Sequence, residues 1–140
     1  MKLNNSSLAK LKGVHPDLMR VVNRCAGDWK DKTLTFIITC GPRTLEEQKI
    51  LKASGASTTL KSRHLIAKNG YSHAVDLGAI IGGKYRGDWP LYHKIAAAMK
   101  AAAKAENVPI EWGGDWKTFQ DGPHYQLPWK QYPGTTKGSK

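Results

Sequence analysis

The sequence predicts an α+β fold in which a small antiparallel β-sheet is flanked by helices. Helical and strand patterns follow one another in a mixed order rather than in the regular alternation of a doubly wound parallel sheet. The chain has 140 residues, of which 40% are hydrophobic, and this is enough for one core of ordinary size. No repeat or low-complexity linker divides it. We therefore expect a single domain over residues 1–140, with its core at about 14–127.

The first part of the chain is predicted to hold three helices and one strand. After a short helical turn, a longer helix begins at Pro16, whose fixed φ suits the first helical position, and Gly27 ends its apolar face. Residues 33–40 read TLTFIITC, a β-branched and aromatic run that alternates as a strand does. Thr44 and Glu47 form a capping-box pattern that opens the third helix.

The second part is predicted to hold four short strands around one long helix. Two strand-like runs lie at about 63–67 and 72–80. An alanine-rich run of high helix propensity follows over about 90–106. Two more short strands frame the turn-rich run WGGDW within 110–127, and the basic tail at 130–140 is expected to be loosely ordered.

Charge and hydropathy limit the classes of function. Lys and Arg number 22 against 11 Asp and Glu, and the net charge of +11 predicts a polyanionic partner such as nucleic acid, an acidic membrane surface or an anionic cell wall. The basic recognition helix that is usual in nucleic-acid-binding modules is not evident in this sequence, which disfavours that class. We also expect no stable membrane insertion and no signal peptide, because apolar runs of sufficient length are absent. Cys25 and Cys40 are interpreted as two thiols.

Two of the five histidines, His64 and His124, stand close to acidic residues in the sequence. Zinc in a hydrolytic site takes three ligands from His and Asp or Glu and leaves a fourth position for water. His64, Asp76 and His124 fit that description. Asp121 lies three residues before His124, which is close enough for it to accept a proton from the water.

The segments around these residues resemble a known family. The runs SRHL and HAVDL, which contain His64 and Asp76, are similar to the S-x-H-x-x-G-x-A-x-D signature of zinc D-Ala-D-Ala carboxypeptidases and dipeptidases. The same signature occurs in their phage relatives, the L-alanyl-D-glutamate endopeptidases used as endolysins. Further motifs match in chain order: GPRT at Arg43, WGGDW from Trp112, and DGPH ending at His124. The WGGDW run favours the phage endopeptidases.

The resemblance implies a hedgehog/DD-peptidase-like zinc peptidase fold and one Zn²⁺ per chain. The implied zinc ligands are His64, Asp76 and His124. It also implies Asp121 as general base and Arg43 as a contact to the substrate or to its oxyanion. Other candidate substrate-binding residues, each with a structural role in the core or a turn as the alternative, are Trp112, Asp115 and Trp116.

The function implied is that of an endolysin, a zinc-dependent peptidoglycan hydrolase that cleaves the L-Ala–D-Glu bond of stem peptides without a covalent intermediate. It would wait in the host bacterial cytoplasm as a monomer and reach the periplasm and cell wall when the inner membrane is breached. Two alternatives stay open. One is a D-Ala-D-Ala carboxypeptidase of the same fold, and the other is a non-catalytic basic protein that binds the wall.

The spacing within the main motif departs from the family pattern. The family has seven residues from the first His to the Asp, whereas positions 64 and 76 are twelve apart, and the five extra residues lie within 66–72. A two-residue turn would place His64 and Asp76 on opposite faces of a hairpin. We therefore expect a three-residue loop at 69–71, which places both on one face. The alternative is that His73 replaces His64 as a ligand.

Overall fold

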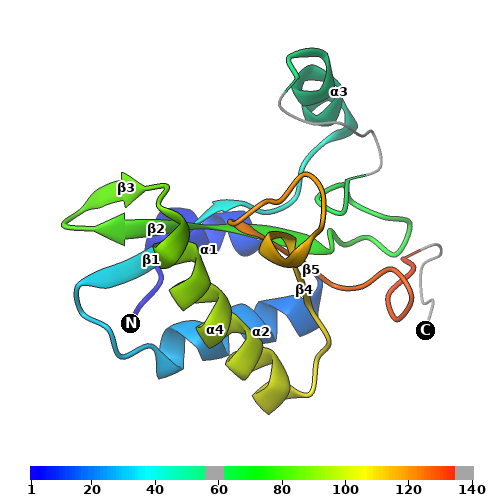
Figure 1. Ribbon diagram of the computed structural model, residues 1–140. Helices are drawn as coiled ribbons and strands as arrows, with labels where there is room; N and C mark the ends of the chain where they lie inside the picture. The colour runs from blue at the N-terminus through cyan, green and yellow to red at the C-terminus, as the bar shows by residue number, and fades with distance from the viewer. Residues whose placement is uncertain (56–61, 135–140) are drawn as a thin grey trace.

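The computed structural model describes residues 1–55 and 62–134 and confirms the predicted α+β class. The elements in chain order are α1 (Asn5–Leu11), α2 (Pro16–Asp28), β1 (Leu34–Cys40), α3 (Leu45–Ala53), β2 (Ala74–Ile81), β3 (Lys84–Arg86), α4 (Trp89–Glu106), β4 (Glu111–Trp112), the 3₁₀ turn η1 (Gly113–Asp115) and β5 (His124–Gln126). Helices α2 and α4 pack together below the sheet, while α3 stands apart above it (Figure 1). Within the described part of the chain, no helix is both long and apolar enough to span a membrane.

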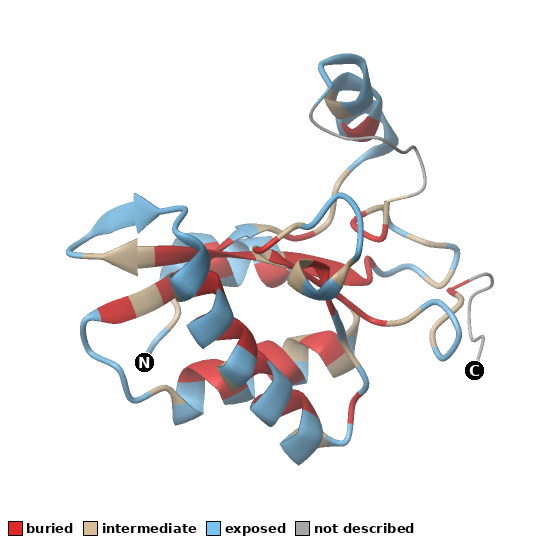
Figure 2. Cartoon of the chain, in the orientation of Figure 1, coloured by how far each residue is buried: buried red, intermediate tan, exposed pale blue. Residues whose placement is uncertain are grey.

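The sheet has the strand order β1-β2-β5-β4, with β3 added to β2, and every pairing is antiparallel. One face packs on α2 and α4, and the buried side chains gather between these layers (Figure 2). Leu34, Phe36 and Ile38 alternate inward along β1, as the period of a strand requires. Burial of each such side chain contributes about 1.5–3 kcal/mol. The opposite face of β2 and β5 is thereby left for polar residues.

The inserted segment does not form the predicted hairpin. Residues 63–67 are not a strand, and the backbone N–H of Ala67 donates to Tyr71 O at 2.8 Å, so the tight loop covers 68–70 rather than 69–71. The reason is competition from more distant partners. Ser72 bonds through its backbone to Gly13 and His15, and the N–H of Arg43 donates to His64 O at 2.8 Å. These tertiary bonds outweigh the local strand pattern.

The described part of the tail contacts the body of the domain. Arg63 donates from Nη2 to Tyr132 O at 2.7 Å, and the Tyr132 hydroxyl donates to Asp17 Oδ2 at 2.7 Å. The Arg63 guanidinium also lies 4.0 Å from the ring centre of Trp129. Residues 130–134 are therefore anchored to the body, while 135–140 of the predicted tail lie outside the described residues.

Gly41 holds the end of β1 against α1, and this contact gives a stability prediction. A Cβ at Gly41 would lie 1.8 Å from the backbone oxygen of Lys10, whereas a Cβ at Gly27 would meet nothing within 4 Å. We expect Gly41→Ala to lower the free energy of unfolding by about 2–3 kcal/mol, because two backbones must separate. Gly27→Ala in α2 should raise it by about 0.5–1 kcal/mol. Urea denaturation measures both, and equal midpoints for the two variants would contradict the prediction.

Candidate active site

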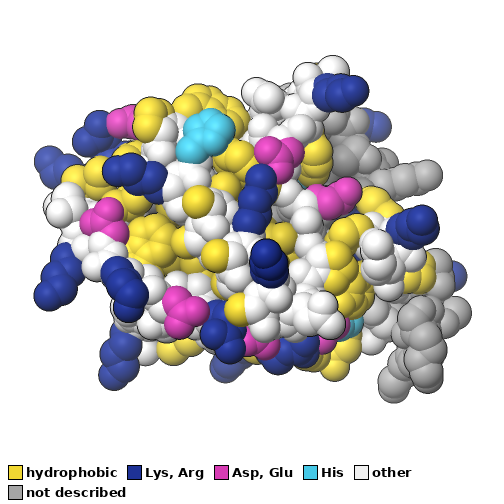
Figure 3. Space-filling view, turned by 60° about the horizontal axis from the view of Figure 1, so that its bottom comes forward, with side chains coloured by type: hydrophobic (Ala, Val, Ile, Leu, Met, Phe, Trp, Pro, Cys, Tyr) yellow, Lys and Arg dark blue, Asp and Glu magenta, His cyan; other side chains and the backbone are white. Residues whose placement is uncertain are grey.

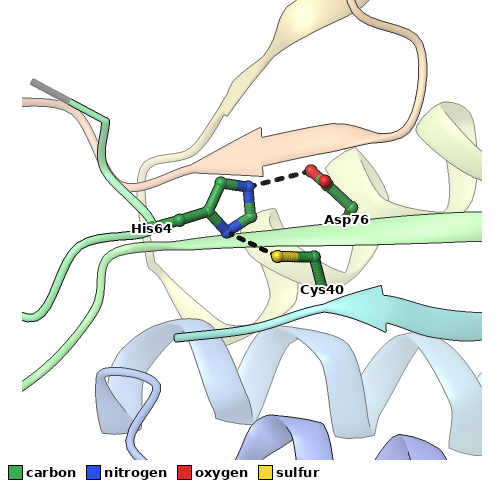
Figure 4. A group of neighbouring side chains, drawn as sticks. All are labelled: Cys40, His64 and Asp76. Atoms are coloured by element: carbon green, nitrogen blue, oxygen red, sulfur yellow. Dashed lines mark hydrogen bonds and ion pairs between the residues drawn. The ribbon is translucent and has the colours of Figure 1, made fainter. Parts of the chain in front are cut away.

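The site is built on a row of three residues across neighbouring strands. Cys40 of β1 pairs with Asp76 of β2, and Asp76 pairs with His124 of β5. A bulge shifts the register of β1 between Ile38 and Cys40, so that two residues of β1 oppose one of β2. Such a bulge re-aims a side chain. It turns Cys40 away from the core and toward the face of Asp76, where Figure 4 shows it.

His64 completes the group from a turn rather than from a strand. Its Nε2 lies 3.1 Å from Asp76 Oδ1, and Nδ1 of His124 lies 3.3 Å from the same oxygen. The rings of the two histidines are 5.1 Å apart between centres. The structure therefore brings His64, Asp76 and His124 together at one carboxylate oxygen, although the register that was predicted to achieve this is wrong.

The outer ring nitrogens of both histidines are held by fixed acceptors. Nδ1 of His64 lies 2.9 Å from the carbonyl oxygen of Gly41, which can only accept, so this nitrogen carries a proton. Nε2 of His124 lies 2.8 Å from Oε1 of Gln126, whose amide nitrogen donates to Glu111 Oε1 at 2.9 Å. The orientation of that amide makes Nε2 of His124 the donor. The lone pairs at Nε2 of His64 and Nδ1 of His124 are thus left to face Asp76.

The distance of each histidine nitrogen from Asp76 suits a shared zinc ion. Two imidazole lone pairs and a carboxylate oxygen repel one another unless a cation or a proton lies between them. Ligand atoms that are 2.0–2.1 Å from a tetrahedral zinc ion are about 3.3 Å from one another, and the spacings to Asp76 Oδ1 are 3.1 and 3.3 Å. In zinc sites, the ring nitrogen of a ligand histidine that does not bind the metal usually donates to a carboxylate or carbonyl oxygen, as both histidines do here. Cys40 also belongs to the neighbourhood, since its sulfur and ligand atoms of His64 and Asp76 lie within 4.8 Å of one another and could hold a metal ion.

The charges of His64 and Asp76 stabilise each other. Burial alone would lower the pKa of His64, but hydrogen bonds with Asp76 and Cys40 outweigh it and raise the pKa to about 10. Burial alone would raise the pKa of Asp76, but hydrogen bonds from His124 and His64 hold it well below its usual range. Without metal, the pair is therefore an imidazolium and a carboxylate.

A metal ion that binds Nε2 of His64 would have to displace its proton, and this gives a pH prediction. Because the folded pKa of about 10 lies above the ordinary value of 6.5, the proton stabilises the metal-free fold fully below about pH 6.5, and this stabilisation is lost as the pH rises through 10. We expect the apparent zinc affinity to rise about tenfold per pH unit between about pH 7 and 9. Competition with a chromophoric chelator measures it. An affinity that levels off above pH 7 would contradict the prediction.

Asp121 and Arg43 stand beside the group. The N–H of Asp121 donates to Gly113 O at 3.0 Å, and a Cβ on Gly113 would lie 2.4 Å from the Asp121 carbonyl oxygen, so the glycine permits this close approach. Burial, and next the charge of Asp76, raise the pKa of Asp121. Its carboxylate makes no hydrogen bond within residues 1–55 and 62–134. The charge of Arg43 also acts on Asp121, which places the two in one electrostatic neighbourhood.

The other candidate residues are spread over different environments. Trp112 is 4% exposed and donates from Nε1 to Gly122 O at 2.7 Å, so it lies in the core, the alternative role that the sequence left open for it. Asp115 pairs with Lys100 at 2.7 Å on the surface rather than with a histidine. Trp116 is half-buried, with its ring 5.2 Å from that of His124, and it alone of the three borders the site.

His73, the alternative ligand, lies in a different cluster. Its ring is 5.4 Å from that of His15, and its Nε2 lies 3.0 Å from Nδ2 of Asn69. Burial, helped by the charge of Arg63, lowers the pKa of His73 to about 4. His73 therefore supports the inserted segment instead of facing Asp76.

Sequence reasoning missed three supporting groups: the carbonyl of Gly41, the amide of Gln126 and the thiol of Cys40. Gln126 had a usable signal, because it lies two residues after His124 and thus on the same face of a strand. Cys40 had none, since alternation from Ile38 assigns it to the core and only the bulge reverses this.

A sheet face that presents an aspartate and a histidine, joined by a second histidine from a turn and with a further acid beside them, offers the ligand types of a catalytic zinc site. The model of the phage L-alanyl-D-glutamate peptidases matches residues 1–127, and the chain belongs to this family. The resemblance found in its motifs is thereby confirmed.

Two relatives place the chain more closely. The L-alanyl-D-glutamate peptidase of Listeria phage A118 is 36% identical over 112 residues, which are 79% of this chain and 37% of the phage protein. The chain therefore spans little more than a third of that relative. The crystal structure of the Serratia marcescens L-Ala D-Glu endopeptidase ChiX matches with a TM-score of 0.82 and 37% identity, over 95% of this chain and 94% of the other.

Proposed function

We propose that this chain is a zinc-dependent peptidoglycan hydrolase of the endolysin type that cleaves the L-Ala–D-Glu bond of stem peptides. The observation that carries the proposal is the convergence of Nε2 of His64 and Nδ1 of His124 on one oxygen of Asp76. The relatives from the Listeria phage and from Serratia are both described as peptidases of this bond. Its place of action is the bacterial cell wall, reached from the host cytoplasm after lysis begins, and it acts as a monomer.

His64, Asp76 and His124 would hold the zinc ion, which supplies Lewis acidity when bound. Asp121 accepts a proton from the attacking water and returns it to the departing amine of D-Glu, a role suited to a carboxylate whose pKa is raised. Arg43 presents its guanidinium to the carboxylate of the substrate or to the developing oxyanion. Gly41 and Gln126 keep the two imidazoles in the tautomers that face Asp76.

The surface charge suits an anionic wall better than a nucleic acid. On the face that Figure 3 turns forward, Lys and Arg side chains are scattered among acidic ones rather than gathered in one patch. A net charge of +11 attracts a polyanion without the need for specific contacts. The wall is thus the partner that both the charge and the family favour.

Digestion of purified peptidoglycan tests the proposal. We expect soluble peptides that begin with D-Glu, identified by mass spectrometry, with release abolished by a chelator and restored by zinc. Free D-alanine as the sole product would replace the proposal with a carboxypeptidase. If the protein binds zinc and the wall but releases no product, the proposal would be replaced by that of a non-catalytic wall-binding protein.

A further inference from the structure

The Cys40 thiol lies between two groups of the site. Its Sγ is 3.6 Å from Nδ1 of His64 and receives a hydrogen bond from Nη2 of Arg43 at 3.4 Å. The β1 bulge is what turns this side chain to the site. A thiol in such a place is either a metal ligand or a support for its neighbours.

The orientation of the His64 ring argues against Cys40 as a ligand. The two nitrogens of an imidazole point in different directions, and Cys40 approaches Nδ1, whereas Asp76 approaches Nε2 (Figure 4). The proton of Nδ1 is already directed at the Gly41 carbonyl at 2.9 Å. The thiol itself donates to the same carbonyl at 3.5 Å. An ion held between Nε2 of His64 and Asp76 would therefore bind the ring nitrogen that Cys40 does not approach.

The contact with Arg43 is the one that bears on the reaction. Nη1 of Arg43 donates to Gln48 Oε1 at 2.7 Å and to Ser62 Oγ at 3.5 Å, while Nη2 donates to Cys40. Gln48 is the buried residue of α3. One end of the guanidinium is therefore bound by a helix and the other by Cys40, the last residue of β1. Among residues 1–55 and 62–134, no carboxylate lies within 4.0 Å of Arg43. Its charge is thus oriented without being neutralised by an ion pair.

We propose that Cys40 is a positioning residue that aims the Arg43 guanidinium at the substrate and that it is not a metal ligand. This inference rests on the proposed function, because the anion that Arg43 meets is a group of the stem peptide. Cys40 and Gln48 bind the guanidinium from two sides, since the thiol accepts from Nη2 and Gln48 accepts from Nη1. Removal of the thiol should free one side of the guanidinium and leave the ligand set intact.

A double-mutant cycle and a cobalt spectrum test the two halves of the proposal. We expect Cys40→Ala to lower kcat/KM on a soluble stem peptide about tenfold, the effect of one misaligned charged hydrogen bond. In the Arg43→Ala background, the same change should alter kcat/KM less than about twofold. Cys40→Ser should restore part of the loss. Cys25→Ala, which alters a buried thiol of α2, is the control and should leave kcat/KM unchanged.

The Co²⁺-substituted protein should show no near-ultraviolet thiolate-to-cobalt band, and Cys40→Ala should leave its spectrum unchanged. A band that disappears in Cys40→Ala, or a hundredfold loss of zinc affinity, would make Cys40 a ligand and overturn the proposal. Equal losses of kcat/KM in both backgrounds would do the same, since they indicate a general structural role. A wild-type protein inactive on peptidoglycan would instead overturn the proposed function, and the cobalt spectrum would still decide whether Cys40 is a ligand.

Discussion

Replacement of Asp121 by Asn should reduce kcat on peptidoglycan stem peptides by about 10²–10⁴-fold, the range that general acid–base catalysis contributes. The amide has nearly the shape of the carboxylate but cannot take the proton of the attacking water. Because burial and the charge of Asp76 raise the pKa of Asp121, its carboxylate binds a proton more readily than an ordinary one. The loss should therefore fall on kcat and leave KM nearly unchanged.

The effect must be separated from loss of metal. Asp121 is not one of the three proposed zinc ligands, which meet at Asp76. Asp121→Asn should therefore keep the zinc affinity within about threefold of the wild-type value. Asp28→Asn is the matched control, since Asp28 is an exposed carboxylate at the end of α2. Steady-state kinetics and chelator competition on the three proteins decide the matter. An Asp121→Asn variant with full kcat would remove this residue from the mechanism.

The strands and helices were largely predictable because their local signals agree with their tertiary environment. The capping box of Thr44 and Glu47 opens α3 as expected, with both of its hydrogen bonds present. The sequence pattern of β1 also gives the core face correctly. Where local and tertiary preferences conflict, as at 63–67, the pattern is misleading, because Arg63 is buried and donates to the carbonyl of Leu127. No local periodicity encodes such a partner.

In the site, the identity of the functional residues was predictable from the sequence, but the way in which the fold brings them together was not. His64, Asp76 and His124 were found from their types and motifs, and they do meet, but by a route that depends on a turn and on long-range backbone bonds. The bulge adds one residue to β1, so that Cys40 points to the opposite face from the one that strand alternation predicts. An alternating sequence pattern cannot show such a bulge. The sequence left the core and a groove open for Trp112, because aromatic residues suit both, and the structure places it in the core.

Replacement of Asp76 by Ala should have the largest effect on metal binding. Structural zinc sites bind with about 10–16 kcal/mol in total, so one ligand of three or four contributes about 3–4 kcal/mol and its loss lowers zinc affinity by about 10²–10³-fold. Asp76 contributes more than an average ligand here, because both histidine lone pairs are aimed at its Oδ1. Hydrolysis of stem peptides should become undetectable at zinc concentrations that saturate the wild type.

The same substitution should also alter the metal-free protein in a way that activity does not report. Hydrogen bonding to Asp76 is the leading cause that holds the pKa of His64 up against its burial, so in Asp76→Ala this pKa should fall from about 10 toward or below its ordinary value of 6.5. The imidazolium then no longer stabilises the fold at neutral pH, and the metal-free variant should lose stability between about pH 6.5 and 10 relative to the wild type. Titration of the histidine ring by NMR measures the first effect and urea denaturation the second. Asp88→Asn, an exposed carboxylate before α4, should change neither, and a His64 pKa that stays near 10 in Asp76→Ala would show that another group holds the proton.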